Sequence, residues 1–74
     1  MFDLIAEFDA HNSFYGKAKV HAGVLYSYGT EVARMADDGA VELLEAADRS
    51  ATTRRHVKEF QLQVEAGYIR REDV

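Results

Sequence analysis

The sequence predicts an α+β domain in which a small antiparallel sheet of three or four strands precedes one C-terminal amphipathic helix packed on one face. Residues 13–44 alternate between apolar and polar side chains, which is the period of half-buried strands. Gly-containing turn signals divide that region into short runs. Residues 50–66 repeat their apolar side chains with the period of a helix.

The first two runs predict a β-hairpin. In SFYGKAKVHA, residues 13–22, the order of side chains is that of a strand with two different faces. One face carries Phe14, Ala18, Val20 and Ala22, and the other carries Tyr15, Lys17, Lys19 and His21. Ala22-Gly23 is a plausible tight turn, and VLYSY then places Val24, Tyr26 and Tyr28 on one face of a second strand.

The next region predicts a third strand and leaves the fourth element open. Gly29-Thr30 ends the second run, and residues 31–35 are best interpreted as a strand because Asp37-Asp38-Gly39 is a strong reversal signal. Residues 40–44 would return as a fourth strand. The good helix formers of AVELLEAAD also allow a short helix, so residues 40–47 stay undecided between strand and helix.

The helix has the clearest signals in the chain. Ser50 is a natural N-cap, because its hydroxyl accepts a backbone N–H of the first turn that has no helical partner. Thr53, Val57, Phe60 and Val64 recur at helical spacing, and we expect this stripe to cover the sheet. Gly67 follows as a stop, and in the charged tail Tyr68 and Ile69 are candidates to pack back on the core.

Length and composition bound the organisation. The 74 residues predict a single domain, 1–74, made of an N-terminal segment (1–11), the sheet (13–44), the helix (50–66) and a tail (68–74). A domain this small has a marginal core, and a homodimer is a common remedy. There is no cysteine, and the acidic N-terminus and short apolar runs resemble neither a signal peptide nor a membrane span. We expect a cytoplasmic protein with no membrane partner.

Charge is divided unevenly along the chain. The net charge of −4 disfavours a general nucleic-acid binder. Residues 31–48 hold six acidic side chains against one arginine, a net −5, whereas residues 49–58 hold four basic side chains and no acid. This division indicates either a solvated surface of mixed sign or a docking patch. The candidate partner-binding residues of the acidic patch are Asp37, Asp38, Glu42 and Glu45.

A basic cluster at the start of the helix is the second candidate site. Positive side chains there oppose the helix dipole, whose N-terminal end is already positive. Two hydroxyls, two guanidinium groups, an ammonium group and free backbone N–H groups would suit a phosphate, a carboxylate or a nucleic acid. These residues are Thr52, Thr53, Arg54, Arg55 and Lys58. The alternative is that both arginines pair with the acidic segment just before them.

Aromatic side chains on the predicted sheet form the third candidate. Exposed tyrosines supply contact area for a protein surface or stacking platforms for bases. Tyr15, Tyr26 and Tyr28 make this aromatic patch, with Lys17 and Lys19 nearby on the first strand. Because a small domain needs its aromatic rings inside, we expect at least one of the three in the core.

Patterns that carry catalysis are absent from the sequence. It shows no nucleophile beside a base, no catalytic carboxylate pair and no glycine-rich phosphate loop. His11, His21 and His56 do not have the spacing of helical metal ligands, and His56 is best interpreted as a structural histidine beside the apolar stripe. We therefore expect no enzyme, no metal and no cofactor.

Three tracts, SFYGKAKV, LYSYGTEVA and SATTRRHVKEF, resemble a family of small proteins of uncharacterised function from phages, prophages and other mobile elements. The resemblance covers roughly residues 12–62 and carries no catalytic residue. It implies a phage accessory protein in the cytoplasm of a bacterial host, most concretely an anti-CRISPR inhibitor whose acidic patch meets the nucleic-acid channel of a CRISPR effector complex. The alternative is a small nucleic-acid-binding or regulatory module that uses Lys17, Lys19 and the basic cluster.

Overall fold

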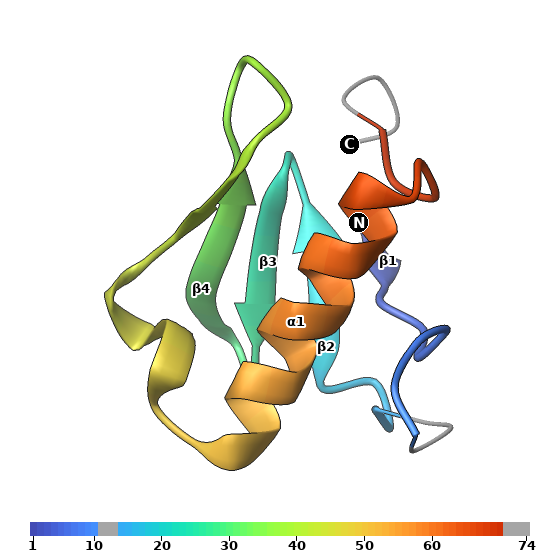
Figure 1. Ribbon diagram of the computed structural model, residues 1–74. Helices are drawn as coiled ribbons and strands as arrows, with labels where there is room; N and C mark the ends of the chain where they lie inside the picture. The colour runs from blue at the N-terminus through green and yellow to red at the C-terminus, as the bar shows by residue number, and fades with distance from the viewer. Residues whose placement is uncertain (11–13, 71–74) are drawn as a thin grey trace.

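A computed structural model describes residues 1–10 and 14–70 of the chain, and these residues form a five-stranded antiparallel sheet and one α-helix (Figure 1). The strands follow one another in space in chain order, β1-β2-β3-β4-β5. They are β1 (Phe2–Asp3), β2 (Ala18–His21), β3 (Val24–Ser27), β4 (Thr30–Met35) and β5 (Val41–Leu43). A 3-10 helix, η1 (Glu45–Asp48), and the helix α1 (Ala51–Glu65) complete the domain. The predicted α+β class is confirmed, with more strands than expected.

The additional strand is β1, which lies inside the predicted N-terminal segment. Phe2 pairs with Val20 and Asp3 with Lys19, and the Leu4 N–H then bonds to the Ala18 carbonyl at 2.8 Å. A strand of two residues shows no alternation of its own, so its partner β2 specifies it and the sequence pattern does not. The predicted limits of the sheet, 13–44, were therefore wrong at the N-terminal side.

The first predicted strand is also shorter than expected, because a turn occupies its beginning. Tyr15 and Gly16 have φ angles of 53° and 72°, and the Lys17 N–H bonds to the Phe14 carbonyl at 2.9 Å. Positive φ at both central positions is the geometry of a type I′ turn, so the extended chain begins only at Ala18. Ser13, where the strand was expected to start, lies outside the described residues, as do His11 and residues 71–74 of the predicted tail.

The two hairpins around β3 use turns of the same kind. Ala22-Gly23 joins β2 to β3 as predicted, with φ angles of 52° and 80°. Tyr28-Gly29 joins β3 to β4 with the same pair of angles, and Ser27 pairs with Thr30 across it. The glycines take the left-handed conformation without steric cost, whereas Tyr28 takes it against the preference of a bulky side chain.

The open choice over residues 40–47 is resolved as a strand followed by a 3-10 helix. Val41 pairs with Met35 and Leu43 with Ala33, which forms β5. The chain then turns into η1, where Ala47 is buried in the core. The helix-forming composition is thus used for one short turn, while pairing with β4 holds the residues before it extended.

Helix α1 confirms the prediction for the C-terminal half. The Ser50 side chain accepts the Thr53 N–H, the helix ends at Glu65 before Gly67, and Thr53, Val57 and Phe60 are buried. Figure 1 shows α1 lying across the sheet in front of β2 and β3, which leaves the other face of the sheet open. The core between them consists mainly of Leu4, Phe14, Ala18, Val20, Leu25, Val32, Ala33, Met35, Ala47, Val57, Phe60 and Ile69.

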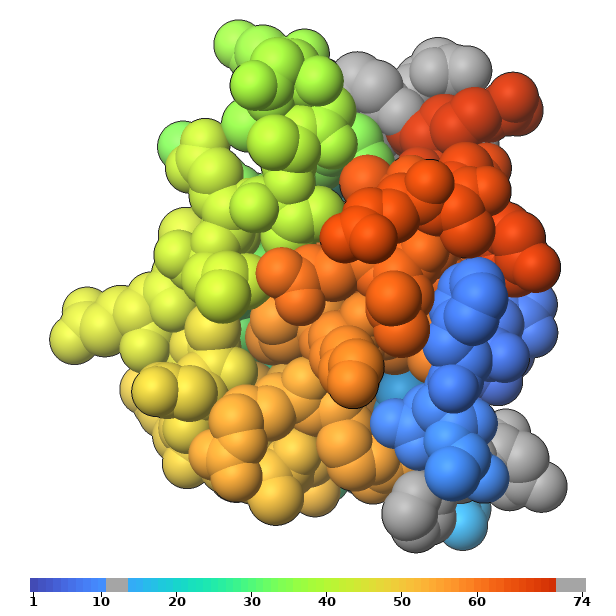
Figure 2. Space-filling model, in the orientation of Figure 1, coloured from blue at the N-terminus to red at the C-terminus, as the bar shows by residue number. Residues whose placement is uncertain are grey.

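The space-filling view shows that segments flank the helix on both sides (Figure 2). The N-terminal segment lies along one side of α1, and the region from β4 to η1 lies along the other. Among the described residues, no helix is both long and apolar enough to cross a bilayer.

Candidate functional surfaces

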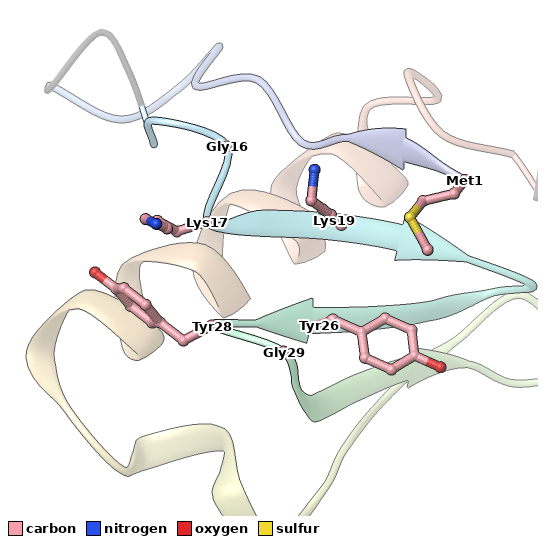
Figure 3. Close-up of a pocket in the computed structure, with 7 residues that line it drawn as sticks. All are labelled: Met1, Gly16, Lys17, Lys19, Tyr26, Tyr28 and Gly29. Atoms are coloured by element: carbon pink, nitrogen blue, oxygen red, sulfur yellow. The ribbon is translucent and has the colours of Figure 1, made fainter.

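The open face of the sheet holds a shallow groove of about 420 Å³ (Figure 3). Lys17, Lys19, Tyr26 and Tyr28 line its walls, and β2 and β3 carry or adjoin all four. Met1, Gly16 and Gly29 complete the lining. Two of the three predicted aromatic residues are thus brought together with the two lysines.

None of the three predicted tyrosines belongs to the core, so the expectation of one buried ring was wrong. Tyr15 is 83% and Tyr28 57% exposed, and Tyr26 is partly buried on the open face. The core is filled instead by aliphatic side chains with Phe14 and Phe60. The period of β3 explains the position of Tyr26, because Leu25 and Ser27 point toward α1 and Tyr26 between them points away. Tyr28 lies in the turn after β3, where its ring centroid is 5.8 Å from that of His56.

The groove has mixed charge. The Lys19 ammonium group lies 2.7 Å from the Asp3 carboxylate, and both side chains are about half exposed. Tyr26 is flanked by Lys19 on β2 and by Glu31 on β4. The surface therefore carries aromatic rings and charges of both signs, and it is not strongly basic.

The four predicted acidic residues are distributed around β5, one of the two edge strands of the sheet. Asp37 and Asp38 lie in the turn between β4 and β5, where the Asp38 carboxylate accepts the Ala40 N–H at 3.0 Å. Glu42 lies on β5 itself and accepts hydrogen bonds from Arg34 at 2.9 and 3.1 Å. Glu45 begins η1, beyond the other end of β5. These four residues, called the acidic frame below, surround the edge strand β5. The Arg34 guanidinium group offsets the charge of Glu42, the residue of the frame that lies on β5.

The basic cluster at the start of α1 does not assemble into one site. Arg55 pairs with Asp9 at 3.0 Å and lies over the Phe14 ring at 5.4 Å, while the Arg54 guanidinium group contacts the Asp48 carbonyl at 3.3 Å. Thr53 is buried, Thr52 partly exposed and Lys58 exposed. Arg55 does pair with an acid, but one in the N-terminal segment and not in the acidic segment before the helix. Arg55 and Lys58 also line a cleft of about 320 Å³ beside that segment.

A row of buried polar side chains along α1 was not predicted beyond Thr53. His56 is fully buried, and its Nδ1 lies 2.7 Å from the Ser27 hydroxyl, which in turn lies 3.2 Å from the Thr53 hydroxyl. Within the part of the chain that the structure describes, the buried Nε2 of His56 has no hydrogen-bond partner. Burial lowers the pKa of His56 below its ordinary 6.5, the positive charge of Arg55 lowers it further, and the Asp9 carboxylate opposes both. The fold therefore favours the neutral imidazole.

Glu59 clamps the N-terminal segment to the helix. Its carboxylate accepts three consecutive backbone N–H groups, those of Glu7, Phe8 and Asp9, at 2.9–3.2 Å. Gln63 donates to the same carboxylate and to the Ile5 carbonyl, each at 2.6 Å. Glu59 and Gln63 are both buried, so a long-range polar network replaces apolar packing on this side of α1. In the sequence, Glu59 and Gln63 lie four residues apart beside the apolar stripe, which indicates that they share one face of the helix. The sequence does not reveal which groups they contact.

The Ser27–His56 contact is buried, and His56 lines none of the grooves described above. Across residues 1–10 and 14–70, no three His, Asp or Glu side chains gather closely enough to hold a metal ion. The aromatic groove on the open face and the acidic frame around β5 are both accessible.

The fold and these surfaces define a small α+β domain whose sheet is covered on one face and open on the other. A model described as "Family of unknown function (DUF8033)" matches residues 3–74, and the chain belongs to this family. The resemblance found in the three sequence tracts is thus borne out as membership of a family without an assigned function, and the description gives no phage or mobile-element context. No curated protein and no solved structure matches the chain.

Proposed function

We propose that this protein is a phage or mobile-element accessory protein that binds a host protein and blocks it, most concretely as an anti-CRISPR inhibitor of a Cas effector in the bacterial cytoplasm. The observation that supports the proposal is the acidic frame around β5, formed by Asp37, Asp38, Glu42 and Glu45. Channels that hold nucleic acid are lined by lysine and arginine, so a negative surface complements them. The protein acts by occupying such a channel, and no catalytic step is required.

The residues of the frame contribute unequally. Glu42 is paired with Arg34, so its charge is largely compensated before any partner arrives. The Asp38 carboxylate also holds the turn through the Ala40 N–H. Reversal of Asp37 and Glu45 changes the charge of the frame and leaves the Arg34–Glu42 pair and the Asp38–Ala40 hydrogen bond in place. Both residues are exposed.

The test compares two variants with the same net charge. Asp37→Lys with Glu45→Lys changes the frame, and Glu7→Lys with Glu65→Lys changes exposed acids elsewhere. Each protein is titrated into DNA cleavage reactions of a panel of purified Cas effectors, after circular dichroism has confirmed folding. We expect the frame variant to inhibit about tenfold or more weakly than the control variant. Equal inhibition by both variants would remove the acidic mechanism, and no inhibition of any effector by the native protein would remove the CRISPR target.

The groove on the open face supports a second candidate, a small nucleic-acid-binding or regulatory module. Tyr26 and Tyr28 lie two residues apart and line one groove with Lys17 and Lys19. Tyr26 lies on β3 and Tyr28 in the turn that follows it. Aromatic rings that line one groove suit the stacking of unpaired bases, and lysines suit the phosphates. Arg54, Arg55 and Lys58 were grouped with this site, but Arg55 is already engaged with Asp9.

Fluorescence anisotropy with a labelled single-stranded oligothymidylate tests the second candidate. Binding should weaken steeply as salt is raised, because displaced counterions dominate the affinity. Tyr26→Ala and Lys17→Gln should each weaken it, whereas Arg49→Gln, which changes an exposed arginine outside these candidate residues, should not. Absence of binding at low salt excludes this module.

A further inference from the structure

β5 is one of the two edge strands of the sheet and lies inside the acidic frame. Leu44 N–H bonds to the Val32 carbonyl at 3.0 Å, and Ala36 N–H bonds to the Ala40 carbonyl at 2.7 Å. The Ala40 carbonyl, the Leu44 N–H and, between them, the backbone groups of Glu42 therefore point toward β4. The alternation of an antiparallel pair then turns the N–H and C=O groups of Val41 and Leu43 outward, where a further strand would pair.

The side chains of β5 divide between two faces. Val41 and Leu43 pair with the buried residues Met35 and Ala33, so they lie on the helix side of the sheet. Leu43 is nevertheless 55% exposed, because it lies at the rim of the sheet. Glu42 pairs with Arg34 on the open face. The edge thus presents apolar contact on one face and a carboxylate on the other.

We propose that β5 is extended by a strand from the partner protein, and that this strand alternates apolar and basic residues. Its apolar side chains would contact Leu43 and Val41 on the helix side, and its basic side chains would lie beside Glu42 on the open face. The carboxylates of the turn and of η1 flank both ends of the added strand. This inference rests on the proposed function, since it specifies how the acidic frame engages a basic protein.

Charge argues against a second copy of this chain as the occupant. Two β5 strands paired with each other would bring two copies of Glu42 together and would overlap the two acidic frames. Like charges facing each other across a strand pair are destabilising, and charged side chains at an edge are a common defence against self-pairing. The same charges attract a cationic segment, so the edge discriminates against itself and in favour of a basic partner.

The experiment uses a synthetic peptide of alternating lysine and valine and a second peptide of the same composition with the two residue types in separate blocks. We expect the alternating peptide to bind more tightly, by about tenfold. In spectra of the labelled protein, the amide protons of Val41 and Leu43 should shift and become protected from exchange on binding, because they enter hydrogen bonds. Equal affinity for both peptides, or unprotected amides at these positions in the complex, would overturn the proposal.

Two variants separate the edge hydrogen bonds from the charge. Leu43→Pro removes an outward N–H without removing a bond to β4, and Leu43→Ala removes the side chain but keeps the N–H. We expect Leu43→Pro to bind the alternating peptide about tenfold more weakly than Leu43→Ala. If Leu43→Pro binds equally while Asp37→Lys with Glu45→Lys abolishes binding, strand addition fails and the acidic-frame function stands. Amide exchange in the native protein decides the matter independently of whether the proline variant folds.

Discussion

His56 couples the stability of the domain to pH at the scale of a single residue. Because the pKa of the buried imidazole is lowered in the folded state, the unfolded chain binds more protons between the two pKa values. The contribution to stability is fully present above the unfolded value near 6.5 and is lost as pH falls through the lower folded value. The free energy of unfolding, measured with a denaturant at several pH values from 7 down to about 5, should therefore decrease as the pH falls.

The variant His56→Gln should remove most of that pH dependence while lowering stability at neutral pH, because the contact with Ser27 is altered. His21→Gln, which removes an exposed histidine from β2, is the control for the loss of a histidine as such. A native pH dependence that persists in His56→Gln would show that another group is responsible.

Arg54 and Arg55 are neighbours in sequence with different roles. Arg55 pairs with a mostly buried Asp9 and lies over Phe14, so Arg55→Gln should lower the free energy of unfolding by about 1 kcal/mol. The exposed contact of Arg54 with a carbonyl is longer, so Arg54→Gln should stay within about 0.5 kcal/mol of the native protein. If chemical denaturation shows that both substitutions change the free energy of unfolding equally, the contact of Arg55 with Asp9 does not stabilise the fold.

At the scale of elements, local signals predicted the structure where they were strong. Ser50, the apolar stripe and Gly67 bounded α1, and Ala22-Gly23 fixed the hairpin. The sequence did not predict contacts between residues far apart in the chain. Nothing local in Phe2–Asp3 marks a strand, and nothing in Glu59 reveals that it accepts three backbone N–H groups from residues 7–9. Composition likewise did not decide whether residues 40–47 form a strand or a helix. Pairing with β4 makes residues 41–43 a strand.

The hairpin turn Ala22-Gly23 offers a stabilising substitution. Ala22 has a φ of 52°, and a left-handed conformation costs most residues roughly 1–2 kcal/mol but costs Asn less. Ala22→Asn should therefore raise the free energy of unfolding by roughly 0.5–1 kcal/mol and the melting temperature by a few degrees. Ala40→Asn, at an exposed alanine outside the left-handed residues, is the matched control and should give no gain.

The clamp between α1 and the N-terminal segment can be broken at Glu59. Glu59→Ala leaves the N–H groups of residues 7–9 without their acceptor and should cost about 1–3 kcal/mol. Faster amide exchange at Glu7, Phe8 and Asp9 should accompany the loss. Glu65→Ala removes an exposed carboxylate from the same helix, and a similar loss there would argue against the clamp.

At the scale of the whole molecule, different surfaces lie on different sides. The acidic frame borders β5, whereas exposed apolar side chains gather where the N-terminal segment meets the end of α1. Phe2, Ile5 and Tyr68 line one groove there, and the rings of Phe8 and Tyr68 lie 5.3 Å apart. Such a surface is unusual for a small monomer and gives the predicted homodimer a location.

Sedimentation over a range of concentrations tests the homodimer. We expect the native protein to self-associate as concentration rises, and Ile5→Asp, which places a charge in the apolar groove, to shift it to the monomer. Glu31→Asp, a conservative change on the open face, should leave the association unchanged. A native protein that is monomeric throughout would contradict this prediction.

The clamp at Glu59 also sets an order of events during synthesis. The Asp9 N–H must wait for an acceptor 50 residues further along the chain. At 5–20 residues per second a ribosome needs roughly 2.5–10 s to make that stretch. During this interval the N–H groups of residues 7–9 lack their acceptor, whereas the pairing of β2 with β3 depends on no residue of α1. Residues 7–9 therefore stay accessible to chaperones and proteases until α1 has been made.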